Sequence, residues 1–223
     1  KESHNRPTLI EIKTVIGYGA PNSGENSVHG KPLSQEDIEA LRENLGYDYP
    51  SFVIPPSVYE FYKENVIERG ILADTQWNTE LKNYSEKYHN EYEVFQNYIY
   101  NSFSIDDYED MPSWEVGSKE STRKVMGKVL DWISTKLPNI MGGSADLCSS
   151  TMVRGANGVF DYDNRQGRNI LFGVREHAMA AICNGITAHG GTKGFGSGFF
   201  VFSDYMKPAI RLAAISNIPS VFL

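Results

Sequence analysis

The sequence predicts an α/β protein in which a parallel sheet is flanked by helices and preceded by a helical connector. Over residues 119–223, short apolar segments alternate with helix-like segments. This alternation is typical of parallel sheets, because parallel strands are joined by helical crossovers. Over residues 57–100, apolar side chains recur at helical spacing among Glu, Lys, Tyr and Asn. We therefore expect three parts: residues 1–56, a connector over 57–118, and an α/β part over 119–223.

The first part combines an apolar run with a loop and a helix. Residues 8–16 are apolar at most positions and predict a strand, and a turn-rich loop that carries His29 follows. Ser34 is a candidate N-cap with acidic residues behind it, and Gly46 is a candidate C-cap. We expect a helix between these two residues.

The connector is expected to be structural. Prolines at 50, 55 and 56 indicate an extended segment, and the pattern over 57–100 predicts amphipathic helices. Residues 101–118 are predicted to be irregular. We find no pattern of chemistry-bearing residues in the connector, and packing on a domain surface accounts for its composition.

The third part supplies the predicted sheet. A helix is expected over 121–136, capped by Ser121 and ended before Pro138. The remaining predictions are strands at 140–147, where the strand runs into a glycine loop, at 170–172, at 194–202 and at 218–223, and helices at 176–189 and 204–217. Ligands bind at the carboxyl ends of strands in such sheets. The loops at 142–146, 174–176 and 202–205 all follow predicted strands.

Composition excludes several classes of protein. The chain has 223 residues, 40% of them hydrophobic and 22% charged, which fits a globular protein with a core. Its net charge of −7 argues against a general nucleic-acid binder, which would carry a basic face. No apolar run reaches membrane-spanning length, so we expect no membrane partner. The two cysteines are too few for a disulfide framework and indicate reduced thiols in the cytoplasm.

Both ends of the sequence fall in apolar runs. The predicted strand at 8–16 begins almost at the first residue, and the run at 218–223 has the composition of a buried parallel strand. Buried strands need neighbours on both edges. We therefore expect the chain to be a fragment of a larger protein.

The strongest functional pattern is a carboxylate followed by aromatic residues. Glu176 begins a predicted helix in Gly-Val-Arg-Glu-His-Ala-Met, and Gly-Phe-Phe-Val-Phe-Ser-Asp-Tyr follows at 198–205. A carboxylate can share a proton with a ring nitrogen while an aromatic face stacks on the ring, so the pair suits a flat heterocyclic cofactor. The simpler alternatives are a glutamate that satisfies a helix dipole and phenylalanines that pack in a core.

Three further residues have two readings each. Asp146, after two glycines, either caps a helix or contacts a ligand. His29 is either a solvated loop histidine or a ligand contact, and Arg123 is either a surface residue or a phosphate anchor. No histidine or cysteine shows metal-binding spacing.

Taken together, these segments resemble the transketolases, which are thiamine-diphosphate enzymes. The order and spacing of six segments fit one protein from end to end, and only residues 57–118 lack a sharp motif. The segments are Lys13–Asn22, Val28–Leu33, Ser121–Lys124, Gly142–Leu147, Gly173–Met179 and Phe202–Leu212. It implies a thiamine-diphosphate-binding fold with an incomplete pyrimidine-type domain. Residues 1–56 would be the C-terminal end of the diphosphate-binding domain, 57–118 the helical connector, and 119–223 the start of the pyrimidine-binding domain.

The resemblance also implies roles for single residues. Glu176 would bond the aminopyrimidine nitrogen of the cofactor and favour formation of the reactive ylid, with His29 as a second catalytic residue. Phe202 would stack on the pyrimidine ring, with Phe199, Tyr205 and Asp146 nearby. Arg123 and Ser150 would anchor the sugar phosphate, and His29 would contact both cofactor and substrate.

For the parent protein, the resemblance implies transfer of a two-carbon ketol unit from a ketose phosphate to an aldose phosphate, in the pentose phosphate pathway. The ligands for Mg²⁺ and for the diphosphate would lie outside this chain, which supplies none of the metal ligands. The parent enzyme would be a cytoplasmic homodimer with sites shared between subunits, and the chain alone is expected to be inactive. The alternatives are a related ketol transferase such as a dihydroxyacetone synthase, or a non-catalytic scaffold module.

Overall fold

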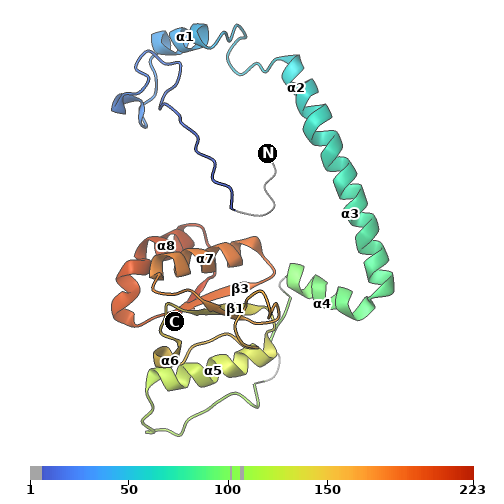
Figure 1. The fold of residues 1–223 in the computed structure, drawn as a ribbon, viewed down its shortest axis with the longest axis vertical. Coiled ribbons are helices and arrows are strands. Elements are labelled where there is room, and N and C mark those ends of the chain that lie inside the picture. The colour runs from blue at the N-terminus through green and yellow to red at the C-terminus, as the bar shows by residue number, and fades with distance from the viewer. Residues whose placement is uncertain (1–6, 101, 106–107) are drawn as a thin grey trace. The chain divides into compact units, whose positions relative to one another are not determined.

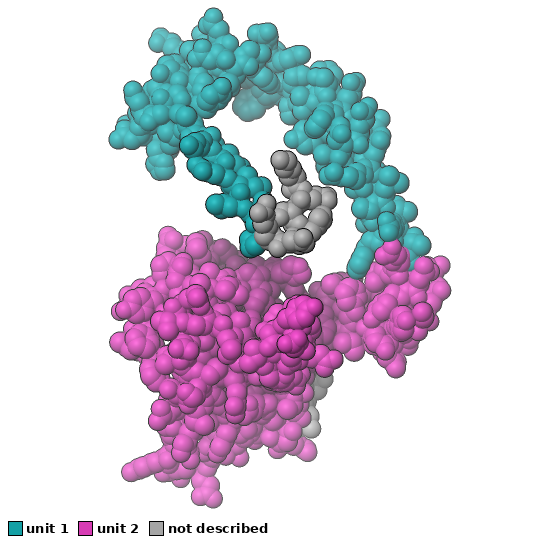
Figure 2. Space-filling view, viewed as in Figure 1, with its two compact units in different colours: residues 1–79 teal, residues 80–223 magenta. Residues whose placement is uncertain are grey.

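A computed structural model describes residues 7–100, 102–105 and 108–223 of the chain. The chain divides into two compact units, residues 1–79 and 80–223, which are coloured separately in Figure 2. The predicted division into three parts, with boundaries after residues 56 and 118, differs from this division into two units and stays a prediction.

The strand predicted over 8–16 is wrong. No strand is assigned among the described residues 7–79. Leu9 is 94% exposed and Ile10 is 76% exposed. A strand forms only where a neighbouring chain segment takes up its backbone hydrogen bonds, and the described part of this unit offers no such segment.

Helix α1, Gln35–Asn44, begins and ends as predicted. The Ser34 side chain accepts a hydrogen bond from the backbone N–H of Asp37 at 3.1 Å, and the Asp37 carboxylate accepts one from the backbone of Ser34. At the other end, Gly46 has a φ of +63°. Its N–H bonds the carbonyl of Glu43 and the next N–H, of Tyr47, bonds the carbonyl of Arg42. This pair of bonds is a Schellman motif.

The predicted helices of the connector are confirmed. They are α2 (Pro56–Tyr62), η2 (Lys63–Ile67, a π-helix), α3 (Glu68–Lys87) and α4 (His89–Ile99). Pro56 occupies the first turn of α2, where its missing N–H costs nothing. The described residues from 102 to 118 form no helix or strand, as expected.

The second unit contains the predicted parallel sheet. Its strands are β1 (Ile140–Ser144), β2 (Asn169–Leu171), β3 (Lys193–Ser197) and β4 (Val221–Phe222). They pair in the order β2-β1-β3-β4, and each pairing is parallel. Gly142 lies at the centre, opposite Asn169 on one side and Phe195 on the other.

Helices cover both faces of the sheet. Helices α7 (Glu176–His189) and α8 (Ser203–Ile215) lie on one face, and α5 (Thr122–Lys136) and the short α6 (Cys148–Thr151) lie on the other (Figure 1). The main core cluster joins α7 and α8 to the sheet through Ala145, Phe172, Met179, Ala180, Cys183, Met206 and Ala209. A smaller cluster of Leu130, Val153 and Phe195 joins α5 to the sheet.

Two predicted details of this unit are corrected. Strand β3 ends at Ser197, and residues Phe200–Phe202 form a 3-10 turn, η3, so the aromatic segment is not a strand. Gly142 and Gly143 belong to strand β1 and not to a loop. A Cβ at Gly142 would lie 1.9 Å from the carbonyl oxygen of Phe195, and one at Gly143 would lie 2.1 Å from that of Ile170. These glycines are needed for close backbone packing within the sheet.

Candidate functional site

Three loops follow the carboxyl ends of neighbouring strands. Each loop has a buried residue in it or next to it, and these three residues belong to one core cluster. Ala145 follows β1, Phe172 follows β2, and Met206 lies in the first turn of α8, after β3. All three side chains are buried in the same apolar cluster. The same edge of the sheet therefore carries Asp146 beside Ala145, Tyr205 beside Met206, and Glu176 four residues after Phe172, as the sequence predicted.

Glu176 is the first residue of α7 and is half-buried. The loop before it turns at Gly173, where φ is +67°, and the Arg175 guanidinium donates a hydrogen bond to the carbonyl of Phe172 at 2.9 Å. This bond closes the loop over the end of β2. The carboxylate stands at the positive end of the helix dipole, where a negative charge is favoured.

The aromatic residues after β3 form a row. The ring centroids of Phe199 and Phe202 are 6.4 Å apart with an interplanar angle of 25°, and those of Phe202 and Tyr205 are 6.2 Å apart at 33°. Phe199 is 39% exposed and Tyr205 is 63% exposed. The turn η3 creates this row, because it places Phe202 one helical turn from each of the other two. Ring faces that remain exposed can accept a further flat ring.

Asp146 is held close to the start of this aromatic segment. Its φ is +59°, and its N–H bonds back to the carbonyl of Ser144 at 2.9 Å. The carbonyl of Ser197 accepts hydrogen bonds from the Ser144 hydroxyl at 2.9 Å and from the N–H of Ala145 at 3.2 Å. These hydrogen bonds join the end of β1 to the end of β3, within two residues of Asp146 and Phe199 in the sequence.

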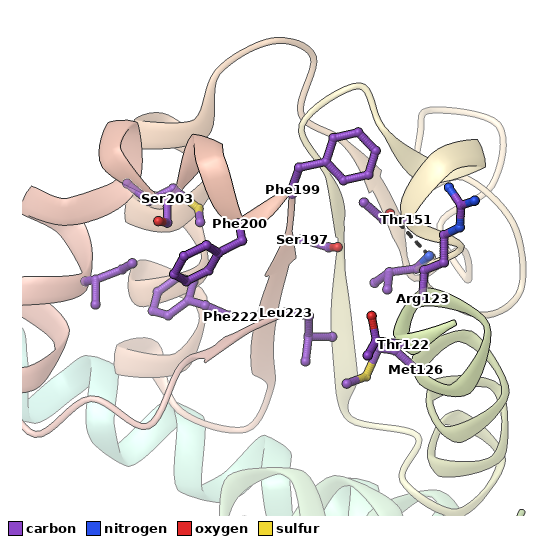
Figure 3. Close-up of a pocket in the computed structure, with 14 residues that line it drawn as sticks. Thr122, Arg123, Met126, Thr151, Ser197, Phe199, Phe200, Ser203, Phe222 and Leu223 are labelled. Carbon is purple, nitrogen blue, oxygen red and sulfur yellow. Dashed lines mark hydrogen bonds between the residues drawn. The ribbon is translucent and has the colours of Figure 1, made fainter. Parts of the chain in front are cut away.

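Arg123 lines a cavity of about 440 Å³, and its guanidinium also contacts Ser150. The Arg123 guanidinium donates to the backbone carbonyl of Ser150 at 3.4 Å. Arg123 and Thr122 lie on the α5 side of the cavity, and Phe200 and Ser203 lie on the α8 side (Figure 3). The structure thus brings Arg123 and Phe199 to one hollow at the carboxyl edge, and Ser150 contacts it through Arg123.

Four polar residues that no sequence pattern indicated also lie at this cavity. Thr122, Thr151, Ser197 and Ser203 all line it. Each lies at the end of a strand or in the first or last turn of a helix, where side chains face the carboxyl edge. Position relative to the strand ends could have identified Ser197 and Ser203, whereas single Ser and Thr residues carry no signal of their own.

His29 lies in the first unit. It is exposed and follows the 3-10 turn η1, Asn26–Val28, with its N–H bonded to the carbonyl of Asn26 at 3.1 Å. The predicted action of His29 together with Glu176 therefore stays a prediction. Among the described residues, no group of three His, Cys, Asp or Glu side chains is arranged to hold a metal ion. No helix in the described part of the chain is long and apolar enough to cross a membrane.

The fold and the site together define a class. A parallel sheet with helices on both faces carries a carboxylate at a helix start and a row of aromatic rings at its carboxyl edge, as a ligand-binding α/β domain does. Two family models match the chain: "Transketolase, thiamine diphosphate binding domain" over residues 1–103, and "Transketolase, pyrimidine binding domain" over residues 118–223. The chain belongs to the transketolase family.

Relatives and solved structures agree with this assignment. The chain is 41% identical over 225 residues to a probable transketolase of Streptococcus pneumoniae, covering 100% of the chain and 34% of that relative. It is 42% identical over 224 residues to the transketolase of Geobacillus stearothermophilus, covering 98% of the chain and 33% of that protein. The chain thus spans about a third of the length of these relatives.

Two solved structures show the same fold. The transketolase of Pichia stipitis, in complex with sedoheptulose-7-phosphate, matches with a TM-score of 0.85 and 34% identity over 98% of the chain and 33% of that protein. The transketolase of Leishmania mexicana matches with a TM-score of 0.84 and 32% identity over 93% of the chain and 31% of that protein. These matches confirm the predicted α/β fold and the resemblance to transketolases.

Proposed function

We propose that the chain contributes the pyrimidine-binding half of a thiamine-diphosphate site to a longer transketolase polypeptide. The whole enzyme would transfer a two-carbon ketol unit from a ketose phosphate to an aldose phosphate. Family membership supports this proposal, and so does the presence of a sugar phosphate in the Pichia stipitis complex. The observation that carries it is the placement of Glu176 and the aromatic row at the same carboxyl edge.

The residues at this edge fit the proposed cofactor. When bound, thiamine diphosphate would supply a nucleophilic carbon and a cationic thiazolium ring that serves as an electron sink. An aminopyrimidine ring is flat and carries ring nitrogens. Partly exposed aromatic faces offer it a stacking surface, and a half-buried carboxylate offers it a hydrogen-bond partner.

Each residue of the chain would then have a distinct task. Glu176 would hold a proton between its carboxylate and a ring nitrogen of the pyrimidine. Phe202 would stack on that ring, and Phe199 and Tyr205 would line the pocket and exclude water. Asp146 would lie beside the cofactor.

The proposed contacts with the substrate include a charged side chain. Arg123 lies at the cavity rim, where its guanidinium can pair with a phosphate dianion, and the neighbouring Ser150 would add a second contact. His29 would donate a hydrogen bond to cofactor and sugar from the diphosphate-binding domain. The preferred substrates would therefore be phosphorylated sugars.

The remaining features of the proposal concern the whole enzyme. Mg²⁺ and the diphosphate group would be held by residues outside this chain. The enzyme would be a homodimer with sites shared between subunits, and it would act in the pentose phosphate pathway. Both cysteines are free thiols, which supports a cytoplasmic location.

Ketol transfer by the full-length enzyme tests the proposal. Replacement Glu176→Ala should lower kcat/KM by about a hundredfold or more, the usual contribution of a positioned proton-transfer group. The matched control is Glu115→Ala, because Glu115 is an exposed glutamate outside the site. If Glu176→Ala keeps the activity of the control, the proposed role of Glu176 is excluded.

A further inference from the structure

Helices α7 and α8 carry the two halves of the proposed pyrimidine site at their N-terminal ends. Glu176 begins α7, and Phe202 and Tyr205 lie at the start of α8. The distance between the carboxylate and the rings therefore depends on how far one helix has slid along the other. The cofactor can be held by both groups only in one such register.

The apolar contacts between these helices are poorly suited to fix that register. The core cluster that the two helices share contains Met179, Ala180 and Cys183 from α7 and Met206 and Ala209 from α8. Apolar burial is non-directional. Methionine is flexible and alanine is small, so small shifts would change these contacts little.

One directional contact does join the two helices. The side-chain amide of Asn184 on α7 donates a hydrogen bond of 2.8 Å to the backbone carbonyl of Ala209 on α8. Asn184 is 9% exposed and lies within an otherwise apolar stretch of its helix. A hydrogen bond tolerates little change in length or angle, so this contact defines one relative position of the helices.

The hydrogen bond between Asn184 and Ala209 joins residues that lie one or two helical turns from the residues of the proposed site. On α7, Glu176, Ala180 and Asn184 are spaced four residues apart and share a face. On α8, Tyr205 and Ala209 are spaced in the same way. A contact between Asn184 and Ala209 therefore fixes the position of the face that carries Glu176 relative to the face that carries Tyr205.

An asparagine at position 184 lowers the stability of the fold, so apolar packing does not explain its presence. The Oδ1 atom of Asn184 is buried and has no hydrogen-bond partner within the described chain. A buried amide with one unsatisfied oxygen stabilises the fold less than an apolar side chain of similar size would. Positioning of α7 against α8 accounts for an asparagine at this place.

We propose that Asn184 is a positioning residue that sets the register between Glu176 and the aromatic row. The inference rests on the proposed function of these groups and adds a residue that touches neither cofactor nor substrate. Asn184 acts through the Ala209 carbonyl, and its contribution is to the affinity for the cofactor.

Two substitutions in the full-length enzyme test this role. Asn184→Leu keeps the approximate size of the side chain but removes the N–H donor, and Asn184→Ala removes the amide. Both should raise the KM for thiamine diphosphate by about fivefold, the factor that corresponds to one lost hydrogen bond. At saturating cofactor, kcat should stay within about twofold of the unmodified enzyme, because the catalytic groups are intact.

The matched control is Cys183→Ala. Cys183 is the adjacent buried residue of α7 in the core cluster, and its truncation should lower the melting temperature without changing the KM for thiamine diphosphate. If the Asn184 variants behave like this control, with lower stability and unchanged KM, Asn184 is only structural and the inference is overturned.

Glu176→Ala, measured in parallel, separates this inference from the proposed function. If Glu176→Ala loses activity but the Asn184 variants keep their KM, the positioning role fails alone. If Glu176→Ala has no effect on activity or on the KM for thiamine diphosphate, the proposed function itself fails.

Discussion

Cys183 and Cys148 differ in the surroundings of their thiols. Cys183 is fully buried in α7, and burial raises the pKa of its thiol to about 12. Cys148 is half-buried at the start of α6, and its thiol donates to the carbonyl of Val153 at 3.3 Å. The reactive thiolate form is therefore strongly disfavoured at Cys183.

This difference predicts selective alkylation of the folded chain. Iodoacetamide at about pH 8 should modify Cys148 and leave Cys183 unmodified, as read by mass spectrometry of the digested protein. Denaturant should make both react. Equal labelling rates in the folded protein would contradict the burial of Cys183.

Asp110 gives a prediction for pH dependence. Its carboxylate accepts a hydrogen bond from the Trp132 indole at 2.9 Å and pairs with Lys136 at 3.0 Å, and these contacts lower its pKa from the usual 3.8. A lowered pKa in the folded state means that the contribution to stability is present above 3.8 and is lost as pH falls through the folded-state pKa.

We therefore expect Asp110→Asn to be less stable than the unmodified chain at neutral pH. The difference should shrink as the pH falls from 3.8 through the lowered folded-state pKa, because the native carboxylate then loses its charge. Urea unfolding at a series of pH values measures it. A difference that stays constant down to the acid limit would rule out the ion pair as its source, and Lys136→Met should reduce the same pH dependence.

At the scale of elements, strand β1 depends on its glycines. A side chain at Gly142 would run into the backbone of β3, whereas a Cβ at Gly198 would meet no heavy atom within 4 Å. The two positions are matched in residue type but differ in available space.

Gly142→Ala should therefore lower the free energy of unfolding by about 2 kcal/mol or more, because the strands must separate to admit the methyl group. Gly198→Ala should change it by less than about 0.5 kcal/mol. Urea unfolding followed by circular dichroism compares them. Similar values for the two variants would contradict the close pairing of β1 and β3.

The elements show what sequence patterns can predict. Local signals were sufficient for α1, where Ser34 and Gly46 mark the two ends, and for α7, which begins at Glu176 as predicted. The strand predicted at 8–16 failed because a strand needs a partner, which an apolar run does not specify. The aromatic segment failed because η3 depends on tertiary packing, and strand propensity misleads there.

The candidate site shows the same limit. Residue types and strand ends sufficed to expect Glu176, Asp146 and the aromatic residues at one edge. The row of Phe199, Phe202 and Tyr205 depends on the turn at η3 and could not be predicted from alternation. The role of Asn184 was also hidden, because a single asparagine in a helix carries no signal until its partner is known.

At the scale of the whole molecule, the core is concentrated in one unit. Both buried clusters lie in residues 80–223. Of the described residues 7–79, Ala20 alone is buried, and large side chains such as Leu72 and Trp77 are 71% and 52% exposed. Burial of apolar area is the main source of folding free energy.

Residues 80–223 expressed alone should therefore unfold cooperatively. Residues 1–79 alone should not, because the described residues 7–79 bury too little apolar surface to form a core. Thermal unfolding by circular dichroism and the dispersion of amide signals in NMR spectra measure this difference. A cooperative transition in isolated 1–79 would contradict the account of where the stability resides.

In the proposed site, Glu176 and Phe202 together bind the pyrimidine ring of thiamine diphosphate. Calorimetric titration of thiamine diphosphate and Mg²⁺ into the full-length enzyme measures this binding. We predict that Glu176→Ala and Phe202→Ala each raise the Kd by about tenfold, the effect of losing one charged hydrogen bond or one ring stack. A Kd that neither substitution changes would contradict the claim.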